Sequence, residues 1–158
     1  MDALDTVAFL SKGMIRYFPV MGRCAYAGGT VFLQRANPHD RQKALEETLT
    51  MCHQSTAVVV FPEGTRAEGD ELRAKVHPRA VHEAWRRGLK VVPIAIAGTG
   101  RIVPKAMDRI GIGEEVAVRI GRPLDPADFD SPERYFQACW GIVGTLFIDA
   151  KTALGARG

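Results

Sequence analysis

Hydrophobic residues along this chain gather in short runs separated by polar segments. Four runs have the length of strands and are rich in β-branched or aromatic residues, at positions 6–10, 30–33, 58–61 and 90–96. Such runs predict strands, and the run at 58–61 is typical of a strand buried on both faces. Pro93 lies inside the last run, which favours an edge strand or a bulge there. Residues 115–120 alternate apolar and charged side chains, which predicts a half-exposed strand.

Helix signals fall between and after these runs. Asn37 and Pro38 fit the cap and first turn of a helix that runs to about residue 51 or 53. A second helix is predicted from Pro78 to residue 87, with Gly88 as its stop. Ser131 caps a third, longer helix. Its apolar side chains recur at helical spacing: Tyr135, Phe136, Cys139, Val143, Leu146, Phe147 and Ala150. This order of strands and helices indicates an α/β fold.

The segment at residues 13–29 is apolar but irregular, because Pro19 and Gly22 interrupt it. Its aromatic and aliphatic side chains are interleaved with Arg16 and Arg23, and this pattern fits two interpretations. Either the segment packs in the core, or it lies on a membrane with its arginines at the level of the lipid headgroups. The sequence leaves both open.

Length and composition describe an ordinary globular protein. The chain has 158 residues, which suits one domain, and we expect residues 1–158 to form it. Hydrophobic residues make up 46% and charged residues 25%, which excludes disordered and fibrous classes. The net charge of +3 favours anionic partners, which include phosphate-bearing ligands, anionic lipid headgroups and nucleic acid.

The cysteines and the hydropathy pattern bear on the cellular setting. Cys24, Cys52 and Cys139 are widely spaced, and no histidine lies at a metal-ligand interval from them. They predict neither a disulfide framework nor a zinc site, so a reducing compartment is the simplest inference. No run approaches the ~18 apolar residues of a transmembrane helix, and the start shows no signal-peptide pattern. If the protein meets a membrane, we expect it to lie on the surface.

The densest chemistry follows the strand predicted at residues 58–61. Pro62 stops the strand, and the next residues are Glu63, Gly64, Thr65 and Arg66. In open α/β sheets, loops beyond the carboxyl ends of strands form the ligand crevice. Gly64 permits a tight turn, and Arg66 offers a fork of donors for phosphate or carboxylate. Glu63 needs a partner, which Arg66 or a substrate hydroxyl would supply. The alternative interpretation is a surface turn with an ion pair between Glu63 and Arg66.

The sequence Phe-Pro-Glu-Gly-Thr-Arg at residues 61–66 resembles the signature of the glycerolipid acyltransferases, the family of the 1-acylglycerol-3-phosphate acyltransferases. Residues 29–35, 91–94 and 98–105 are similar to other blocks of that family in the same order, so the resemblance covers residues 7–125. It implies a mixed, mostly parallel sheet flanked by helices, as in the glycerol-3-phosphate acyltransferases. It also implies a substrate-binding set for the glycerol phosphate of the acceptor: Arg35, Glu63, Gly64, Thr65 and Arg66.

Two segments match known patterns only in part. The family carries a phenylalanine-lysine-x-glycine element after the signature, whereas residues 74–77 here are Ala-Lys-Val-His, so only the lysine persists. Residues 98–100 imitate the start of a dinucleotide-binding fingerprint. Val103 takes the third glycine position and Pro104 follows, so the sequence predicts no helix N-terminus there to hold a pyrophosphate.

Acyl transfer from a thioester needs a base, because the acceptor hydroxyl must lose a proton as it attacks. The family is known for a histidine and an aspartate separated by four residues, upstream of the matched blocks. Here Asp2 is the better match for that catalytic aspartate and Asp5 the alternative, and in both alignments the histidine would lie before Met1. Either the sequence begins at an internal methionine of a longer protein, or the domain is a binding remnant. His77 and His82 are the remaining candidate bases, although neither has an aspartate at catalytic spacing.

The resemblance implies transfer of an acyl group from acyl-coenzyme A or acyl carrier protein to a lysophospholipid such as 1-acylglycerol 3-phosphate. It implies no metal, no bound cofactor, no nucleic-acid partner and a cytoplasmic protein attached peripherally to the inner face of the membrane. The alternative is a non-catalytic domain that binds lipid phosphate or acyl carrier protein. A small nucleotide-binding protein is a third class, which the sequence disfavours because no phosphate-cradling glycine loop is present.

Overall fold

The computed structural model describes residues 6–12, 23, 31–33, 43, 45–46, 49–50, 56–65, 69–102 and 111–155. The chain divides into two compact units, Met1–Phe61 and Pro62–Gly158. Among the described residues each unit has its own sheet, with three strands in the first and two in the second.

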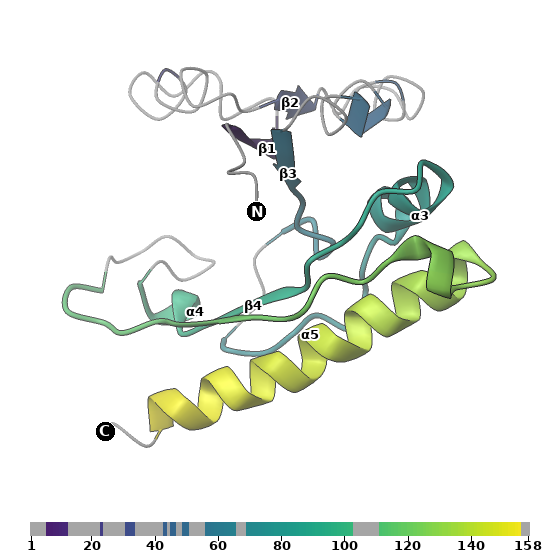
Figure 1. Ribbon diagram of the computed structural model, residues 1–158. Helices are drawn as coiled ribbons and strands as arrows, with labels where there is room; N and C mark the ends of the chain where they lie inside the picture. The colour runs from purple at the N-terminus through teal and green to yellow at the C-terminus, as the bar shows by residue number, and fades with distance from the viewer. Residues whose placement is uncertain are drawn as a thin grey trace. The chain divides into compact units, whose positions relative to one another are not determined.

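The sheet of the first unit is parallel (Figure 1). Its strands are β1 (Thr6–Lys12), β2 (Val31–Leu33) and β3 (Thr56–Val59), in the order β2-β1-β3. Leu10 of β1 pairs with Val31, and Thr6 pairs with Thr56. Parallel neighbours need long crossover connections, which residues 13–30 and 34–55 provide. All three strands overlap hydrophobic runs that predicted strands, although β3 begins two residues before the run at 58–61 and shares only Val58 and Val59 with it.

The described residues of the second connection are helical: Lys43, Leu45, Glu46, Leu49 and Thr50. Leu45 and Leu49 are buried and lie four residues apart, so they share one face of the helix. The hydroxyl of Thr50 donates to the carbonyl oxygen of Glu46 at 2.8 Å. These residues agree with the helix predicted from residue 38 to residue 51 or 53.

The second unit combines an antiparallel strand pair with a long helix (Figure 1). Its elements are α3 (Arg79–Arg86), β4 (Ile94–Ala97), α4 (Thr99–Ile102), β5 (Ala117–Ile120), a 3-10 turn (Pro126–Asp128) and α5 (Pro132–Gly155). Ile94 of β4 pairs with Ile120 of β5, and Ala97 pairs with Ala117. The helices α3 and α5 lie where capping signals and apolar spacing predicted them.

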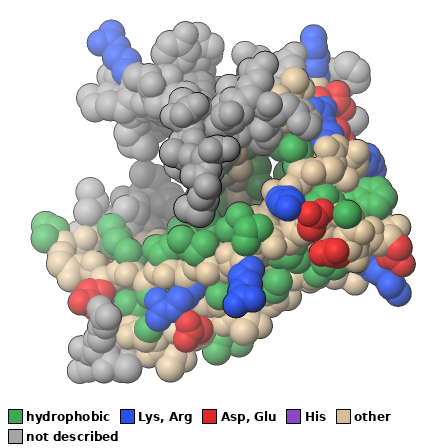
Figure 2. Space-filling view, viewed as in Figure 1, with side chains coloured by type: hydrophobic (Ala, Val, Ile, Leu, Met, Phe, Trp, Pro, Cys, Tyr) green, Lys and Arg blue, Asp and Glu red, His purple; other side chains and the backbone are tan. Residues whose placement is uncertain are grey.

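Small residues let α5 pack closely on one face of the strand pair. Ala95, Ala97 and Ala117 are buried in a cluster with Phe147 and Ala150 of α5. Alternate residues of a strand point to opposite faces. The other face exposes four aliphatic side chains: Ile94, Ile96, Val118 and Ile120. Figure 2 shows hydrophobic side chains in a row over these strands.

A second cluster joins α3 to α5. Val81 of α3 is buried with Tyr135 and Cys139 of α5. The hydroxyl of Tyr135 lies 3.1 Å from the carbonyl oxygens of Leu89 and Leu124. This buried side chain therefore holds the segment before β4 and the segment after β5 against the same helix.

Three details differ from the sequence prediction. β3 ends at Val59, and Phe61 is 59% exposed, so the run at 58–61 is not a strand buried on both faces. β4 begins only after Pro93, because proline has no N–H to donate to a ladder, and its burial alternates. A helical turn, α4, follows Gly98 where the sequence predicted no helix N-terminus.

The strand and helix order confirms the α/β fold, with two parallel strand pairings and one antiparallel pairing. No helix among the described residues has the length and apolar character required to cross a bilayer. The apolar segment at 13–29 lies outside the described residues, apart from Arg23.

Candidate functional site

The signature turn, residues 62–65, is shaped by one left-handed residue. Gly64 has a φ of 64°, a conformation that glycine adopts without a steric penalty. Pro62, Glu63 and Gly64 are half-buried, whereas Thr65 is exposed. The tight turn predicted for Gly64 is therefore present, and it leaves the hydroxyl of Thr65 open to solvent.

Glu63 is held in place by Arg73, ten residues later. The backbone N–H of Arg73 donates to the Oε1 of Glu63 at 3.2 Å. The guanidinium of Arg73 donates in turn to the backbone carbonyl oxygen of Glu63, also at 3.2 Å. Both the carboxylate and the backbone of Glu63 are thus fixed. The other carboxylate oxygen, Oε2, accepts no hydrogen bond from a described residue.

His77 closes the loop against the start of the signature turn. Its backbone N–H donates to the carbonyl oxygen of Pro62 at 2.8 Å. Its ring lies over Gly64, because a β-carbon at position 64 would stand 3.0 Å from Cδ2 and 3.4 Å from Nε2 of the imidazole. The exposed imidazole of His77 therefore borders the signature turn.

The loop after the signature is anchored a second time at Asp70. The backbone N–H of Gly98 donates to the carboxylate of Asp70 at 2.9 Å, and the Nζ of Lys151 donates to the Asp70 carbonyl oxygen at 2.9 Å. Gly98 has a φ of 90°, and a β-carbon there would stand 2.5 Å from the carbonyl oxygen of Glu115. Because only glycine avoids this clash, glycine at position 98 allows the backbone N–H to reach the carboxylate of Asp70.

The two histidines named as candidate bases, His77 and His82, have different surroundings. His82 lies within α3, where its ring meets the ring of Phe136 edge to face with centroids 6.0 Å apart. That contact is typical of packing between helices. His77 borders the signature turn.

The structure describes only part of the site predicted from the sequence. Glu63, Gly64 and Thr65 are brought together in one turn. Asp2, Arg35 and Arg66 lie outside the described residues. Sequence reasoning missed Arg73 and Asp70, and the only available signal was that both are charged residues in a loop close to the signature.

Other features of the second unit offer no competing reactive centre among the described residues. No group of three or more histidine, cysteine, aspartate or glutamate side chains that could hold a metal ion is found there. Cys139 is buried, and burial raises the pKa of its thiol to about 11, so the thiol is a poor nucleophile. A shallow groove of about 410 Å³ runs along α5, but the residues that line it are not titratable: Gln137, Ala138, Gly141, Ile142, Thr145 and Leu146.

Comparison with known proteins points to one family. A family model described as Acyltransferase matches residues 1–97. A lyso-ornithine lipid O-acyltransferase of Pseudomonas aeruginosa is 32% identical over 126 residues, which cover 78% of this chain and 47% of the relative. A chloroplastic 1-acyl-sn-glycerol-3-phosphate acyltransferase of Brassica napus is 33% identical over 116 residues, which cover 73% of this chain and 33% of the relative.

A solved structure agrees with these sequence matches. The 1-acyl-sn-glycerophosphate (LPA) acyltransferase PlsC from Thermotoga maritima superposes with a TM-score of 0.75 at 28% identity. The match covers 91% of this chain and 56% of that protein. The chain spans about a third to a half of the length of these curated relatives.

Proposed function

Because this chain belongs to the acyltransferase family, we propose that it serves in the transfer of an acyl group to a hydroxyl of a lysophospholipid such as 1-acylglycerol 3-phosphate. The proposed acceptor-binding residues are Arg35, Glu63, Gly64, Thr65 and Arg66. Asp2 is proposed as the carboxylate that orients a histidine base. The names of the relatives support this class of reaction, since they include acyltransferases for lysophosphatidate and for a lyso-ornithine lipid.

One observation carries the proposal: the signature turn holds a half-buried carboxylate with one oxygen unused by the described residues. Arg73 fixes Oε1 and the backbone of Glu63, so Oε2 has a defined position. A carboxylate in this state would accept a hydrogen bond from a glycerol hydroxyl and orient it. Arg73 already supplies the partner that a half-buried Glu63 needs, so an ion pair with Arg66 is not required to explain its burial.

The chemistry of the proposed reaction sets the roles of these groups. The acceptor oxygen attacks the thioester carbonyl carbon, a C–O bond forms, the C–S bond breaks, and the proton of the hydroxyl leaves to a base. Arg66 and Arg35 would bind the phosphate, because a guanidinium can donate two parallel hydrogen bonds to it. Binding energy at the phosphate would then position the hydroxyl several bonds away.

The acyl donor and the location are proposed on the same basis. The donor would be acyl-coenzyme A or acyl carrier protein, and no metal or other cofactor would take part. Because the proposed acceptor is a lipid, the protein would act at the cytoplasmic face of a membrane, with the apolar segment at 13–29 as the candidate contact surface. Binding to anionic liposomes that weakens as salt rises would support an electrostatic contribution.

A substitution at Arg66 tests the proposed acceptor site. Arg66→Ala should weaken binding of glycerol 3-phosphate, measured by calorimetry, by about 1.5–3 kcal/mol, because it removes a charge-assisted contact. Arg66→Lys keeps the charge and loses the fork, so it should recover only part of the affinity. Arg134→Ala is the matched control, since the exposed guanidinium of Arg134 on α5 pairs with Asp130 among the described residues. Full affinity in Arg66→Ala would refute the assignment.

A non-catalytic binding domain is the second candidate, and one sequence observation favours it. After the signature, residues 74–77 are Ala-Lys-Val-His, so the family's phenylalanine-lysine-x-glycine element keeps only its lysine. An assay of thioester consumption separates the candidates: turnover by this chain would support the enzyme, whereas acceptor binding without turnover would support the binding domain.

A further inference from the structure

The segment that leads from Arg73 into α3 carries basic side chains at every second position. The four residues in order are Arg73, Lys75, His77 and Arg79. Lys75, His77 and Arg79 are exposed, whereas the intervening Val76 and Pro78 are half-buried. The three exposed side chains are therefore open to solvent. We call Lys75, His77 and Arg79 the basic row.

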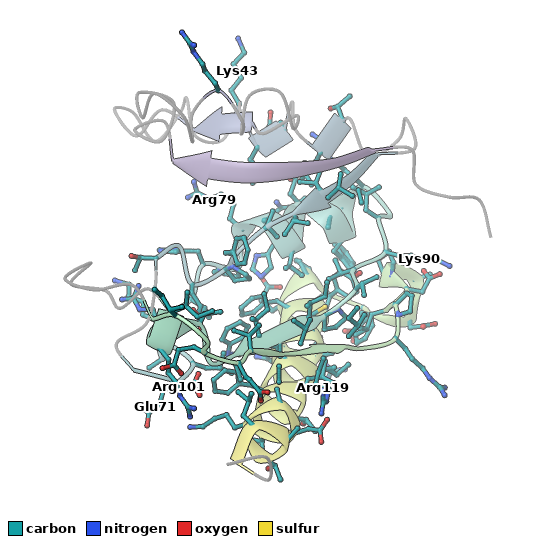
Figure 3. The ribbon with its side chains drawn as sticks, turned by 90° about the vertical axis from the view of Figure 1, so that its left-hand side faces the viewer. Lys43, Glu71, Arg79, Lys90, Arg101 and Arg119 are labelled. Carbon is teal, nitrogen blue, oxygen red and sulfur yellow. The ribbon has the colours of Figure 1, made fainter. Side chains whose placement is uncertain are left out.

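The basic row borders the signature turn through its middle member. His77 lies against Gly64, and its backbone N–H is bound to Pro62, so the two chain segments run next to each other at this point. Lys75 and Arg79 flank His77 in the sequence, and Figure 3 labels Arg79 at the start of α3. A headgroup held by the turn would therefore meet the imidazole of His77, with Lys75 and Arg79 two residues away on either side.

Neighbouring carboxylates do not neutralise the basic row. No ion pair joins Lys75, His77 or Arg79 to an acid within the described part of the chain. The carboxylates of Glu63 and Asp70 accept backbone hydrogen bonds from Arg73 and Gly98, and neither forms an ion pair with the row.

The acid on α3 is engaged as well. Glu83 pairs with Arg86 and Arg87. Glu71 is exposed and precedes the row. Among the described residues, no acid forms an ion pair with the basic row, whose middle member borders the signature turn.

We propose that the basic row extends the acceptor site and selects a phosphomonoester headgroup over a zwitterionic amino-acid headgroup. This inference rests on the proposed function and adds residues to it. A phosphomonoester carries up to two negative charges and three acceptor oxygens, so several cationic donors can bind it together. A headgroup with one carboxylate and one ammonium gains less, because the ammonium is repelled by the same charges. The row therefore decides between the two acceptor classes named by the relatives.

Single substitutions in the full chain test the row. Lys75→Gln, His77→Gln and Arg79→Gln should each weaken binding of glycerol 3-phosphate, measured by calorimetry, by about two- to tenfold. His82→Gln is the matched control, because it makes the same chemical change on α3 at a ring that packs on Phe136. Far-ultraviolet circular dichroism and the melting temperature should stay unchanged in the three row variants, since their side chains are exposed.

Selectivity is the second measurement. The unaltered chain should bind 1-acylglycerol 3-phosphate more tightly than lyso-ornithine lipid, and the triple Gln variant should lose that preference. Inorganic phosphate should bind more weakly than glycerol 3-phosphate, because it lacks the glycerol hydroxyl that would donate a hydrogen bond to Glu63. Equal affinity for the two phosphates would overturn the assignment to a lipid headgroup.

The outcomes separate this inference from the proposed function. If the unaltered chain binds glycerol 3-phosphate and the three row variants bind it equally well, the row has no role and the proposed function stands. If the unaltered chain binds none of the phosphate ligands, both are overturned. Weaker binding in the row variants with an unchanged His82→Gln control supports both.

Discussion

Replacing Gly64 by alanine should destabilise the second unit through two separable effects. The first is the φ of 64°, which costs a residue with a side chain about 1–2 kcal/mol. The second is steric, since the new β-carbon would stand 3.0 Å from Cδ2 of His77. Overpacking costs roughly 1–3 kcal/mol, and the exposed His77 ring can move, so the lower end applies. We expect a total loss of about 2–3 kcal/mol in the free energy of unfolding.

Two further variants separate the two effects. Gly88 follows α3 with a φ of 68°, and a β-carbon there would meet nothing within 4 Å. Gly88→Ala should therefore lose only the conformational part, about 1–2 kcal/mol. In a His77→Ala background the Gly64→Ala substitution should cost the same as Gly88→Ala, because the ring that blocks the β-carbon is gone.

Urea unfolding followed by tryptophan fluorescence suits the measurement. Both tryptophans, Trp85 and Trp140, lie in the second unit, so the signal reports on the unit that contains Gly64. The free-energy cost of Gly64→Ala in the unaltered chain, minus its cost in the His77→Ala background, is the coupling energy of a double-mutant cycle. We expect it to be about 1 kcal/mol. A coupling near zero, with equal losses for Gly64→Ala and Gly88→Ala, would show that the ring of His77 does not lie against Gly64.

Three further predictions concern buried or paired side chains. Tyr135→Phe should cost about 1–2 kcal/mol in urea unfolding, because it removes the hydroxyl that binds two backbone carbonyls; an unchanged midpoint would contradict those bonds. The thiol of Cys139, whose pKa burial raises to about 11, should react with iodoacetamide at pH 8 far more slowly in the native protein than in urea, as mass spectrometry can show. The hydrogen bond from Arg87 lowers the pKa of Glu83 below its usual 4.5, so this pair stabilises the fold above that pH and the contribution is lost as pH falls through the lower folded-state pKa. Glu83→Gln should therefore lower the melting temperature at pH 7 and have a smaller effect near pH ~3; an equal effect at both would exclude the ionic contribution.

Local signals account for most of the fold that could be predicted. The start of α5 follows from Ser131, whose hydroxyl accepts from the N–H of Arg134 at 3.3 Å as a helix cap should. The end of α3 follows from Gly88, which is left-handed as expected after a helix. The limits of the strands were harder to predict. The hydrophobic run at 90–96 continues through Pro93, but β4 begins only at Ile94, because proline has no N–H to donate to the strand pair.

The contacts of the site depend on the path of an irregular loop. The apolar run at 58–61 predicted the place of the signature turn, and Gly64 predicted its shape. Nothing periodic in residues 69–77 shows that Arg73 reaches back to Glu63, or that His77 covers Gly64. These contacts arise from tertiary structure, so the sequence identified the turn but not the residues that hold it.

The hydrogen bond from Lys151 to Asp70 has a consequence for synthesis of the protein on the ribosome. The two residues are 81 positions apart, so the donor is made long after the acceptor. At about 5–20 residues per second, the ribosome needs about 4–16 s to extend the chain from one residue to the other. During that interval the loop after the signature lacks this support, although every residue of the signature has already been translated. A nascent chain halted before residue 151 would lack this bond at Asp70, and we expect proteases to cleave its residues 69–77 more readily than those of the finished protein.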